Sequence, residues 1–341
     1  LILTYYDSTG KAQKQYFYEM ETGLSLSANF SREFDELTKD GLRGNLNHKM
    51  AVIYIDGNGF GALQDKLCKT PGLQQDFDSY VRRQRQTMLR ALLTDVIQAD
   101  PNGWLTGDRR YRIETLLWGG DEMTWVVPAW QGWKVLQFFY EYTRGQWGPD
   151  GTATTGGGWA FQGVPLHHAA GLVFCHHNAP ISRVTKLAKD LAGLAKEIGR
   201  GSMTNSKKYE VPDLFAYQVL ESFDHIGGDL EHHLKLRCNW DPSLESLLLP
   251  GAAMQEIEKQ LPAFRKGFPR RKLHQIVRAL AKWDVKTTEN TANEVTGQLE
   301  PETTKALQQL SASFKHPQTQ WLHLLELWDY VAPDNNGQGG A

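Results

Sequence analysis

Two short segments constrain the fold of this 341-residue chain most strongly, because each joins an apolar run to glycines and a carboxylate. The first is Ala51–Leu63, with the sequence AVIYIDGNGFGAL, and the second is Leu116–Pro128, with LLWGGDEMTWVVP. A carboxylate beside buried strands is unfavourable unless it is paired or binds a metal. Two such places in one chain predict that Asp56 and Asp121 share a cation.

The composition excludes several classes of protein. Hydrophobic residues make up 40% and charged residues 22% of the chain, which is typical of a packed globular protein. With 37 Lys and Arg against 39 Asp and Glu, the net charge of −2 gives no overall basic field for non-specific binding of nucleic acid. The three cysteines are widely spaced and form no CxxC pair, which argues against a disulfide scaffold and against a structural zinc site.

Targeting signals and membrane spans are not expected. The first ten residues lack the basic and apolar regions of a signal peptide, and no apolar run approaches the ~20 residues of a membrane span. We therefore expect a cytoplasmic protein that does not contact a membrane. The chain begins with Leu1 rather than methionine, which is compatible with a piece of a longer protein.

Residues 1–49 are expected to form an N-terminal adapter. Ile2–Tyr6 and Gln15–Met20 are rich in β-forming residues and flank a turn signal at residues 7–10, which predicts a hairpin. The polar stretch Phe30–Lys49 predicts a short helix and a loop that leads into the first buried strand.

Residues 50–240 carry strand and helix signals whose order predicts an α+β domain. Strands are predicted at Met50–Ile55, Arg112–Trp118, Met123–Val127, Leu166–Cys175 and Leu214–Leu220. Helices are predicted at Phe60–Cys68, Phe77–Ile97, Trp130–Tyr142 and Pro180–Ile198, the last with Gly199 as its C-cap. The short Gly-rich connection after Trp118 predicts a hairpin. We expect a mixed or antiparallel sheet with helices on one face, as in a ferredoxin-like palm.

The C-terminal part differs in character. Helical periodicity dominates residues 241–333, where prolines and glycines separate four or five segments, so we expect a helical domain. Residues 334–341 are rich in Gly and Asn and predict a disordered tail.

The paired carboxylates suit the transfer of a nucleotidyl group. Two divalent ions ~3.5–4 Å apart neutralise phosphate charge and activate a hydroxyl, and such ions prefer oxygen ligands. Gly57 can lend its carbonyl to the metal, and the backbone amides of Asn58, Gly59 and Phe60 can contact phosphate. Glycines beside the carboxylates, including Gly119 and Gly120, let a triphosphate approach the backbone.

The order of a strand ending in DGNGFG, a long helix, a GGDE hairpin, a helix and the segment Ala170–Arg200 resembles the palm of the nucleotidyl cyclase superfamily. That superfamily includes GGDEF diguanylate cyclases, class III adenylyl cyclases and the Cas10/Cmr2 polymerase-cyclases of type III CRISPR systems, and the palm of Cas10/Cmr2 is the most similar. The resemblance covers Met50–Glu221 and implies that Asp56, Gly57 and Asp121 are metal ligands. It also implies that Lys196 contacts the triphosphate.

The resemblance further implies the activity. The chain would use Mg²⁺ or Mn²⁺, two ions, to convert a nucleoside triphosphate, with ATP favoured, into a cyclic nucleotide or oligonucleotide messenger in antiviral defence. Asp56 and Asp121 would be catalytic, with Glu122 assisting. A product of two or more nucleotides requires an acceptor site, which a second palm from a homodimer or a partner protein can supply. RNA is a further possible partner.

Departures from the family pattern keep other functions open. Asn58 stands where many relatives have a second acid, and Glu122 replaces the second Asp of GGDD. No His-Asp dipeptide occurs, so the HD nuclease domain common in Cas10 is not in this chain. The alternatives are a degenerate palm that binds a nucleotide or cyclic nucleotide as a sensor, and an interaction subunit of an RNA-guided complex.

Several motifs also have simpler interpretations. The glycines after Asp56 loosely match a dinucleotide-binding fingerprint or form a plain turn, and GGDE can be a simple hairpin turn. Lys196 can be a helix-end lysine that complements the helix dipole. Of the adjacent histidines His176 and His177, one, His177, is a candidate for nucleotide contact. The basic run 265–272 can contact RNA or form a solvated helix start.

Overall fold

The computed structural model describes residues 13–148, 158–201, 209–221, 244–314, 316–317 and 319–332. The chain divides into two units, Leu1–Leu220 and Glu221–Ala341. The expected strand Ile2–Tyr6 and the expected tail 334–341 lie outside the described residues.

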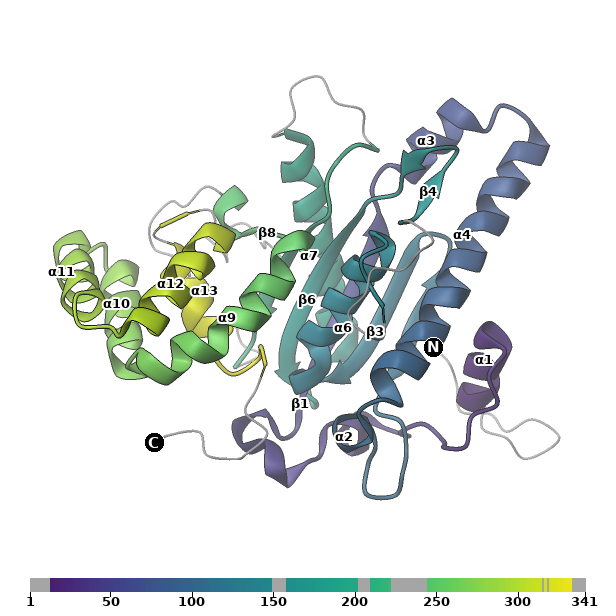
Figure 1. Cartoon of the computed structure of the whole chain (residues 1–341). Coiled ribbons are helices and arrows are strands. Elements are labelled where there is room, and N and C mark those ends of the chain that lie inside the picture. The colour runs from purple at the N-terminus through teal and green to yellow at the C-terminus, as the bar shows by residue number, and fades with distance from the viewer. Residues whose placement is uncertain are drawn as a thin grey trace. The chain divides into compact units, whose positions relative to one another are not determined.

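The first unit is built on a mixed sheet whose strands lie in the order β2-β3-β1-β6-β7 (Figure 1). All neighbouring pairs in this order are antiparallel except β6 and β7. The strands predicted within residues 50–240 and the hairpin predicted after Trp118 are confirmed. Their bounds are Glu114–Gly119 for β2, Glu122–Pro128 for β3, Lys49–Gly57 for β1, His168–His176 for β6 and Leu214–Val219 for β7. A separate two-stranded ribbon pairs β4, Ala160–Phe161, with β5, Val164–Pro165.

Strand β1 lies at the centre because both of its faces are apolar. Every side chain from Met50 to Ile55 is buried, and the strand pairs with β3 on one side and β6 on the other. Such a continuous apolar run needs cover on both faces of the sheet. The strand extends to Gly57, so Asp56 is its penultimate residue.

The helices of the first unit cover both faces of this sheet. A Cβ added at Gly132 in α6 would meet Ala51, Leu172 and Phe174, which share one face. A Cβ added at Gly171, on the opposite face, would meet the backbone of Ala188 in α7. The expectation of helices on one face is therefore wrong, because the amphipathic segment before Gly201 covers the second face.

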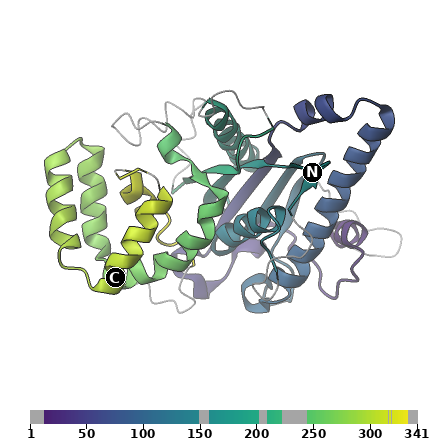
Figure 2. The ribbon, with the colours of Figure 1, turned by 45° about the horizontal axis from the view of Figure 1, so that its top comes forward.

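The helices of the first unit agree well with the sequence periodicity. Figure 1 and Figure 2 both show the long helix α4 running beside the sheet. The bounds are Phe34–Thr38 for α2, Gly41–Leu46 for the 3-10 helix η1, Phe60–Leu67 for α3, Pro71–Ala91 for α4 with a π-helical continuation η2 at Leu92–Ile97, Pro101–Trp104 for α5, Ala129–Thr143 for α6 and Ile181–Gly201 for α7.

Gly199 does not end α7, contrary to expectation, because the helix continues to Gly201. A Cβ at this position would lie 2.7 Å from Val211 and 3.0 Å from Leu214. The glycine therefore serves close packing against the segment that leads into β7.

The N-terminal hairpin expectation is wrong for Gln15–Met20, which belongs to helix α1, Gln13–Thr22. The buried residues of this helix, Lys14, Tyr18 and Thr22, are four positions apart, which is a helical and not a strand period. The Tyr18 ring stacks on Phe30 with a centroid distance of 4.1 Å, and Lys14 pairs with buried Glu114. These contacts outweigh the β propensity of the aromatic residues.

The second unit is mainly helical in the part that the structure describes, as expected. Its helices are α9 at Met254–Gly267, α10 at Arg270–Ala281, α11 at Val285–Thr296, α12 at Pro301–Phe314 and α13 at Thr319–Glu326. The 3-10 turns η3, Leu244–Leu247, and η4, Gly251–Ala253, flank the short strand β8, Leu249–Pro250. The core contains Ile257, Leu261, Phe264, Leu310 and Phe314.

Across the described residues, every helix is too short or too polar to cross a lipid bilayer.

Candidate functional site

The two carboxylate segments meet at one edge of the sheet. Asp56 near the end of β1 is the register partner of Glu122, the first residue of β3. The hairpin before β3 turns at Gly120, whose φ of 52° is a left-handed conformation that favours glycine. This turn places Asp121 against Gly57, where a Cβ on the glycine would lie 2.9 Å from the Asp121 Cβ.

Lys196 of α7 reaches the end of β1 and contacts two oxygens there. Its Nζ lies 2.5 Å from Asp56 Oδ2 and donates to the Gly57 carbonyl oxygen at 2.7 Å. Both side chains are largely buried, at 15% and 22% exposed. A carboxylate and a carbonyl oxygen thus converge on one cation, and the ammonium group stands where a divalent ion would use the same donors.

Asp121 lies in an unfavourable electrostatic position. Burial raises the pKa of its carboxyl group above the ordinary value, and the neighbouring negative charge of Asp56 raises this pKa further. Lys196 acts in the opposite direction but does not cancel these effects. A second positive charge between Asp56 and Asp121 would relieve the repulsion, so the donor set fits a divalent cation.

Glu122 is held differently from Asp121. The Tyr54 hydroxyl donates a hydrogen bond of 2.6 Å to Glu122 Oε1, and Lys189 Nζ lies 3.2 Å from the same oxygen. The hydrogen bond from Tyr54 lowers the pKa of Glu122, and burial together with this bond raises the pKa of Tyr54 well above its usual value. Glu122 therefore remains charged beside the site, with one oxygen engaged by neighbouring residues.

The residues after Asp56 have varied environments. The backbone N–H of Asn58 donates to the His167 carbonyl, so it is not free for phosphate. The Asn58 side chain is buried and donates to the carbonyls of Val211 and Pro212. Gly59, with φ of 67°, is the N-cap of α3. The Phe60 ring packs in the core, which leaves its backbone as the part that can face a ligand.

His177 does not join this group. It follows β6 at the end of the sheet where β1 begins, since Lys49 and His176 are register partners. Asp56 lies at the other end of β1, and consecutive residues of a strand rise ~3.3 Å, so the two positions are roughly 26 Å apart. The expected nucleotide contact of His177 is thus separated from the expected metal ligands.

The basic run 265–272 is engaged within the second unit. Arg265 donates to the carbonyls of Trp328 and Val331. Arg270 pairs with Asp329 at 2.5 Å, and Lys272 lies 3.2 Å from Glu294. These contacts give the run a structural role as a helix-packing segment.

Sequence reasoning missed three residues around the carboxylates. Tyr54 precedes Asp56 by two positions and therefore shares its face of β1, and Lys189 precedes Lys196 by two helical turns and shares its face of α7. Both relations could be predicted from the sequence spacing. The proximity of Arg85 in α4 to Asp121 could not, because its buried position next to Trp118 depends on the tertiary fold.

Comparison of the chain with protein-family models and with curated proteins gives no match.

Proposed function

We propose that this chain is a metal-dependent nucleotidyltransferase with a palm-like first unit. Its substrate is a nucleoside triphosphate, with ATP favoured, and its product is a cyclic nucleotide or oligonucleotide that acts as a messenger in antiviral defence. A 3′-hydroxyl loses its proton to solvent, its oxygen forms a new bond to the α-phosphorus, and the bond from the α-phosphorus to the oxygen that bridges to the β-phosphate breaks as pyrophosphate leaves. The order of the elements supports this proposal, because strand, helix, hairpin, helix, strand and helix follow one another as the resemblance requires.

One observation carries the proposal. Asp56 Oδ2 and the Gly57 carbonyl oxygen both point at the Lys196 ammonium, and the Asp121 carboxyl group lies beside them with a raised pKa. A structural ion pair would need one lysine and one carboxylate. The second carboxylate, Asp121, whose pKa stays raised despite Lys196, is the feature that favours a cation site over a simple hairpin turn.

The carboxylates and the lysines would have different roles in the proposed reaction. Asp56, Gly57 and Asp121 would hold Mg²⁺ or Mn²⁺, and the bound ions would neutralise charge on the phosphates and the leaving pyrophosphate. Lys189 and Lys196 place positive charge on the face of α7 that adjoins these carboxylates. A triphosphate would gain charge-assisted hydrogen bonds from them.

A second candidate function is nucleotide sensing without turnover. Asn58 favours it, because its side-chain amide is tied to backbone carbonyls and supplies no charge. Glu122 already accepts a hydrogen bond from Tyr54 and pairs with Lys189. The site then relies for metal binding on Asp56, which pairs with Lys196, and on Asp121.

Turnover separates the two functions. The purified chain is incubated with each nucleoside triphosphate and Mn²⁺, and pyrophosphate and nucleotide products are resolved by mass spectrometry. Asp56→Asn and Asp121→Asn should abolish the product, whereas Asp190→Asn, at a half-exposed carboxylate paired with Lys186, should not. The assay is repeated with co-purified RNA, because RNA-dependent turnover would indicate a subunit of an RNA-guided complex.

Product formed equally by the wild type and by Asp121→Asn would contradict the enzymatic proposal. Nucleotide binding by the wild type without any pyrophosphate, with or without RNA, would favour the sensor.

A further inference from the structure

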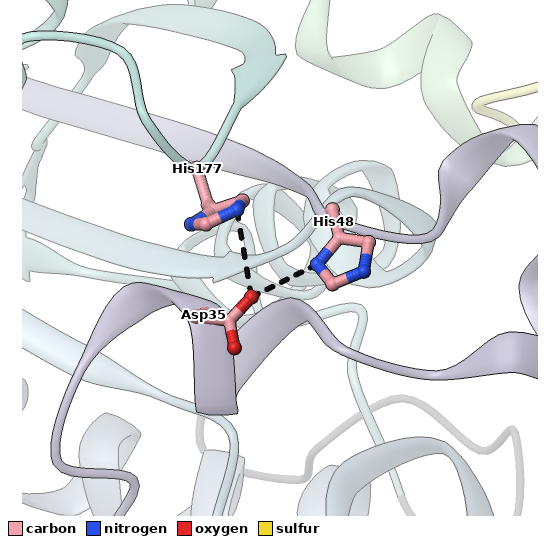
Figure 3. Close-up of side chains that lie close together, drawn as sticks. All are labelled: Asp35, His48 and His177. Atoms are coloured by element: carbon pink, nitrogen blue, oxygen red, sulfur yellow. Dashed lines mark hydrogen bonds and ion pairs between the residues drawn. The ribbon is translucent and has the colours of Figure 1, made fainter.

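Three side chains from distant parts of the sequence converge at the end of the sheet where β1 begins, which is the opposite end from Asp56. Asp35 lies in α2, His48 directly precedes β1 and His177 directly follows β6. Figure 3 shows both imidazole rings directed at one carboxylate oxygen of Asp35. One ligand atom from each residue lies within 4.8 Å of the other two.

The two distances from Asp35 are close to those between ligands of one small metal ion. His48 Nδ1 lies 2.9 Å and His177 Nε2 lies 3.5 Å from Asp35 Oδ1. Zinc binds imidazole nitrogen and carboxylate oxygen at ~2.0–2.2 Å in a tetrahedron, so two of its ligand atoms are about 3.3–3.5 Å apart. The His177 separation lies at this value and the His48 separation is about 0.4 Å shorter, while the two imidazole nitrogens lie within 4.8 Å of each other.

The backbone holds His48 and His177 side by side. The His177 N–H donates to the His48 carbonyl at 2.9 Å, and the His48 N–H donates to the Thr38 carbonyl at 3.1 Å. His48 adopts a φ of 63°, a left-handed conformation that is unfavourable for a non-glycine residue. The two backbone hydrogen bonds hold His48 in this conformation, in which its ring contacts Asp35.

The ligand chemistry selects the metal. Two imidazole nitrogens and one carboxylate favour zinc and its first-row neighbours over Mg²⁺, which prefers oxygen ligands alone. The Asp35 and His48 side chains are 40% and 34% exposed, so an ion can enter from solvent. The lack of a CxxC pair argues only against a zinc site built from cysteines, and this cluster contains no cysteine.

We propose that Asp35, His48 and His177 bind one zinc ion, with solvent as the fourth ligand. The ion would fasten α2 to the start of β1 and to the turn after β6. This site is independent of the proposed function, because it lies at the far end of β1 from Asp56. His176 is its natural control: it neighbours His177, but its Nδ1 accepts a hydrogen bond from the Asn178 N–H and takes no part in the cluster.

The test uses the full-length chain without a histidine tag, stripped of metal. Zinc is titrated in competition with a chromophoric chelator, and Co²⁺ is titrated while the visible spectrum is recorded. The wild type and His176→Gln should each bind one equivalent of zinc and give the intense visible bands of tetrahedral Co²⁺. Asp35→Asn and His177→Gln should bind zinc at least tenfold more weakly and give no such bands. Excess Mg²⁺ should not displace the zinc.

Three results would overturn the site. These are a wild type that binds no stoichiometric zinc, an Asp35→Asn or His177→Gln variant that binds it as tightly as the wild type, or a His176→Gln variant that loses it. The wild-type titration decides the question even where a variant fails to fold, because an ordinary hydrogen-bonded Asp-His pair would bind no stoichiometric zinc.

Discussion

Lys196 Nζ and Asp56 Oδ2 lie 2.5 Å apart, and the same ammonium group donates to the carbonyl of Gly57. This pair joins α7 to the end of β1 and neutralises one of two neighbouring aspartates. The other, Asp121, remains in a buried and repulsive position that raises its pKa. One lysine therefore faces two carboxylates at this end of the sheet.

Replacement of the lysine should make the chain depend on metal for stability. Lys196→Met leaves Asp56 and Asp121 without their neutralising cation, so the free energy of unfolding in EDTA should fall by about 1–3 kcal/mol. Mn²⁺ should restore more stability to this variant than it adds to the wild type, as measured by thermal unfolding. Lys186→Met, at an exposed pair on the same helix, should change stability by no more than about 0.5 kcal/mol. Equal behaviour of the two variants would refute the prediction.

Removal of the Asp121 charge should stabilise the metal-free chain and abolish its function. The ionised carboxylate destabilises the fold above its raised pKa, and this penalty is relieved as pH falls through that pKa. Asp121→Asn should therefore unfold at a higher temperature than the wild type in EDTA at pH 7.5. Its turnover should fall by roughly 10²-fold or more, because a metal ligand supplies several kcal/mol of transition-state stabilisation. A lower unfolding temperature for Asp121→Asn than for the wild type in EDTA would contradict the conclusion that the ionised Asp121 carboxylate destabilises the fold.

Gly57 is expected to tolerate no side chain. A Cβ here would lie 2.7 Å from the Phe60 ring and 2.9 Å from the Asp121 Cβ, so Gly57→Ala must displace the aspartate. We expect turnover to drop at least tenfold while the far-UV circular dichroism stays unchanged. Gly61→Ala is the matched control, since its Cβ would enter open space in helix α3. It should keep full turnover, and an equal loss in both variants would exclude the steric explanation.

Acid should destabilise the fold through His168. Its ring is buried among Phe60, Phe139 and Trp159, and burial lowers its pKa to about 4. Below pH 6.5 the unfolded chain binds a proton that the folded chain does not, so stability falls from pH 6.5 towards pH 4, by about 3 kcal/mol. His168→Phe should remove this part of the pH dependence in urea unfolding, while titration of the carboxylates stays common to both chains. A variant that loses as much stability as the wild type would refute the role of His168.

The central part of the fold was predictable because its signals are local. The apolar run ended by Asp56 predicts a buried strand, and the glycines between Trp118 and Glu122 predict the hairpin. Spacing alone also places Tyr54 on the face of Asp56. The strand prediction for Gln15–Met20 failed because burial of Lys14 and Tyr18 against β2 and Phe30 is a tertiary effect.

The cluster of Asp35, His48 and His177 at the other end of the sheet was not predictable from spacing. His48 and His177 are far apart in sequence, and they meet only because β1 and β6 pair antiparallel with Lys49 opposite His176. That register depends on the whole sheet. Once it is known, position 48 must face position 177, and the convergence follows from simple counting along the two strands.

The most direct measurement for the carboxylate site is the binding of Mn²⁺ in the presence of a non-hydrolysable ATP analogue, followed by electron paramagnetic resonance. The wild type should bind two ions with the nucleotide beyond those held by the analogue alone, and Asp56→Asn should bind neither of them at the same concentrations. If the Asp56→Asn variant binds Mn²⁺ and nucleotide as the wild type does, the assignment of Asp56, Gly57 and Asp121 as a metal-nucleotide site is contradicted.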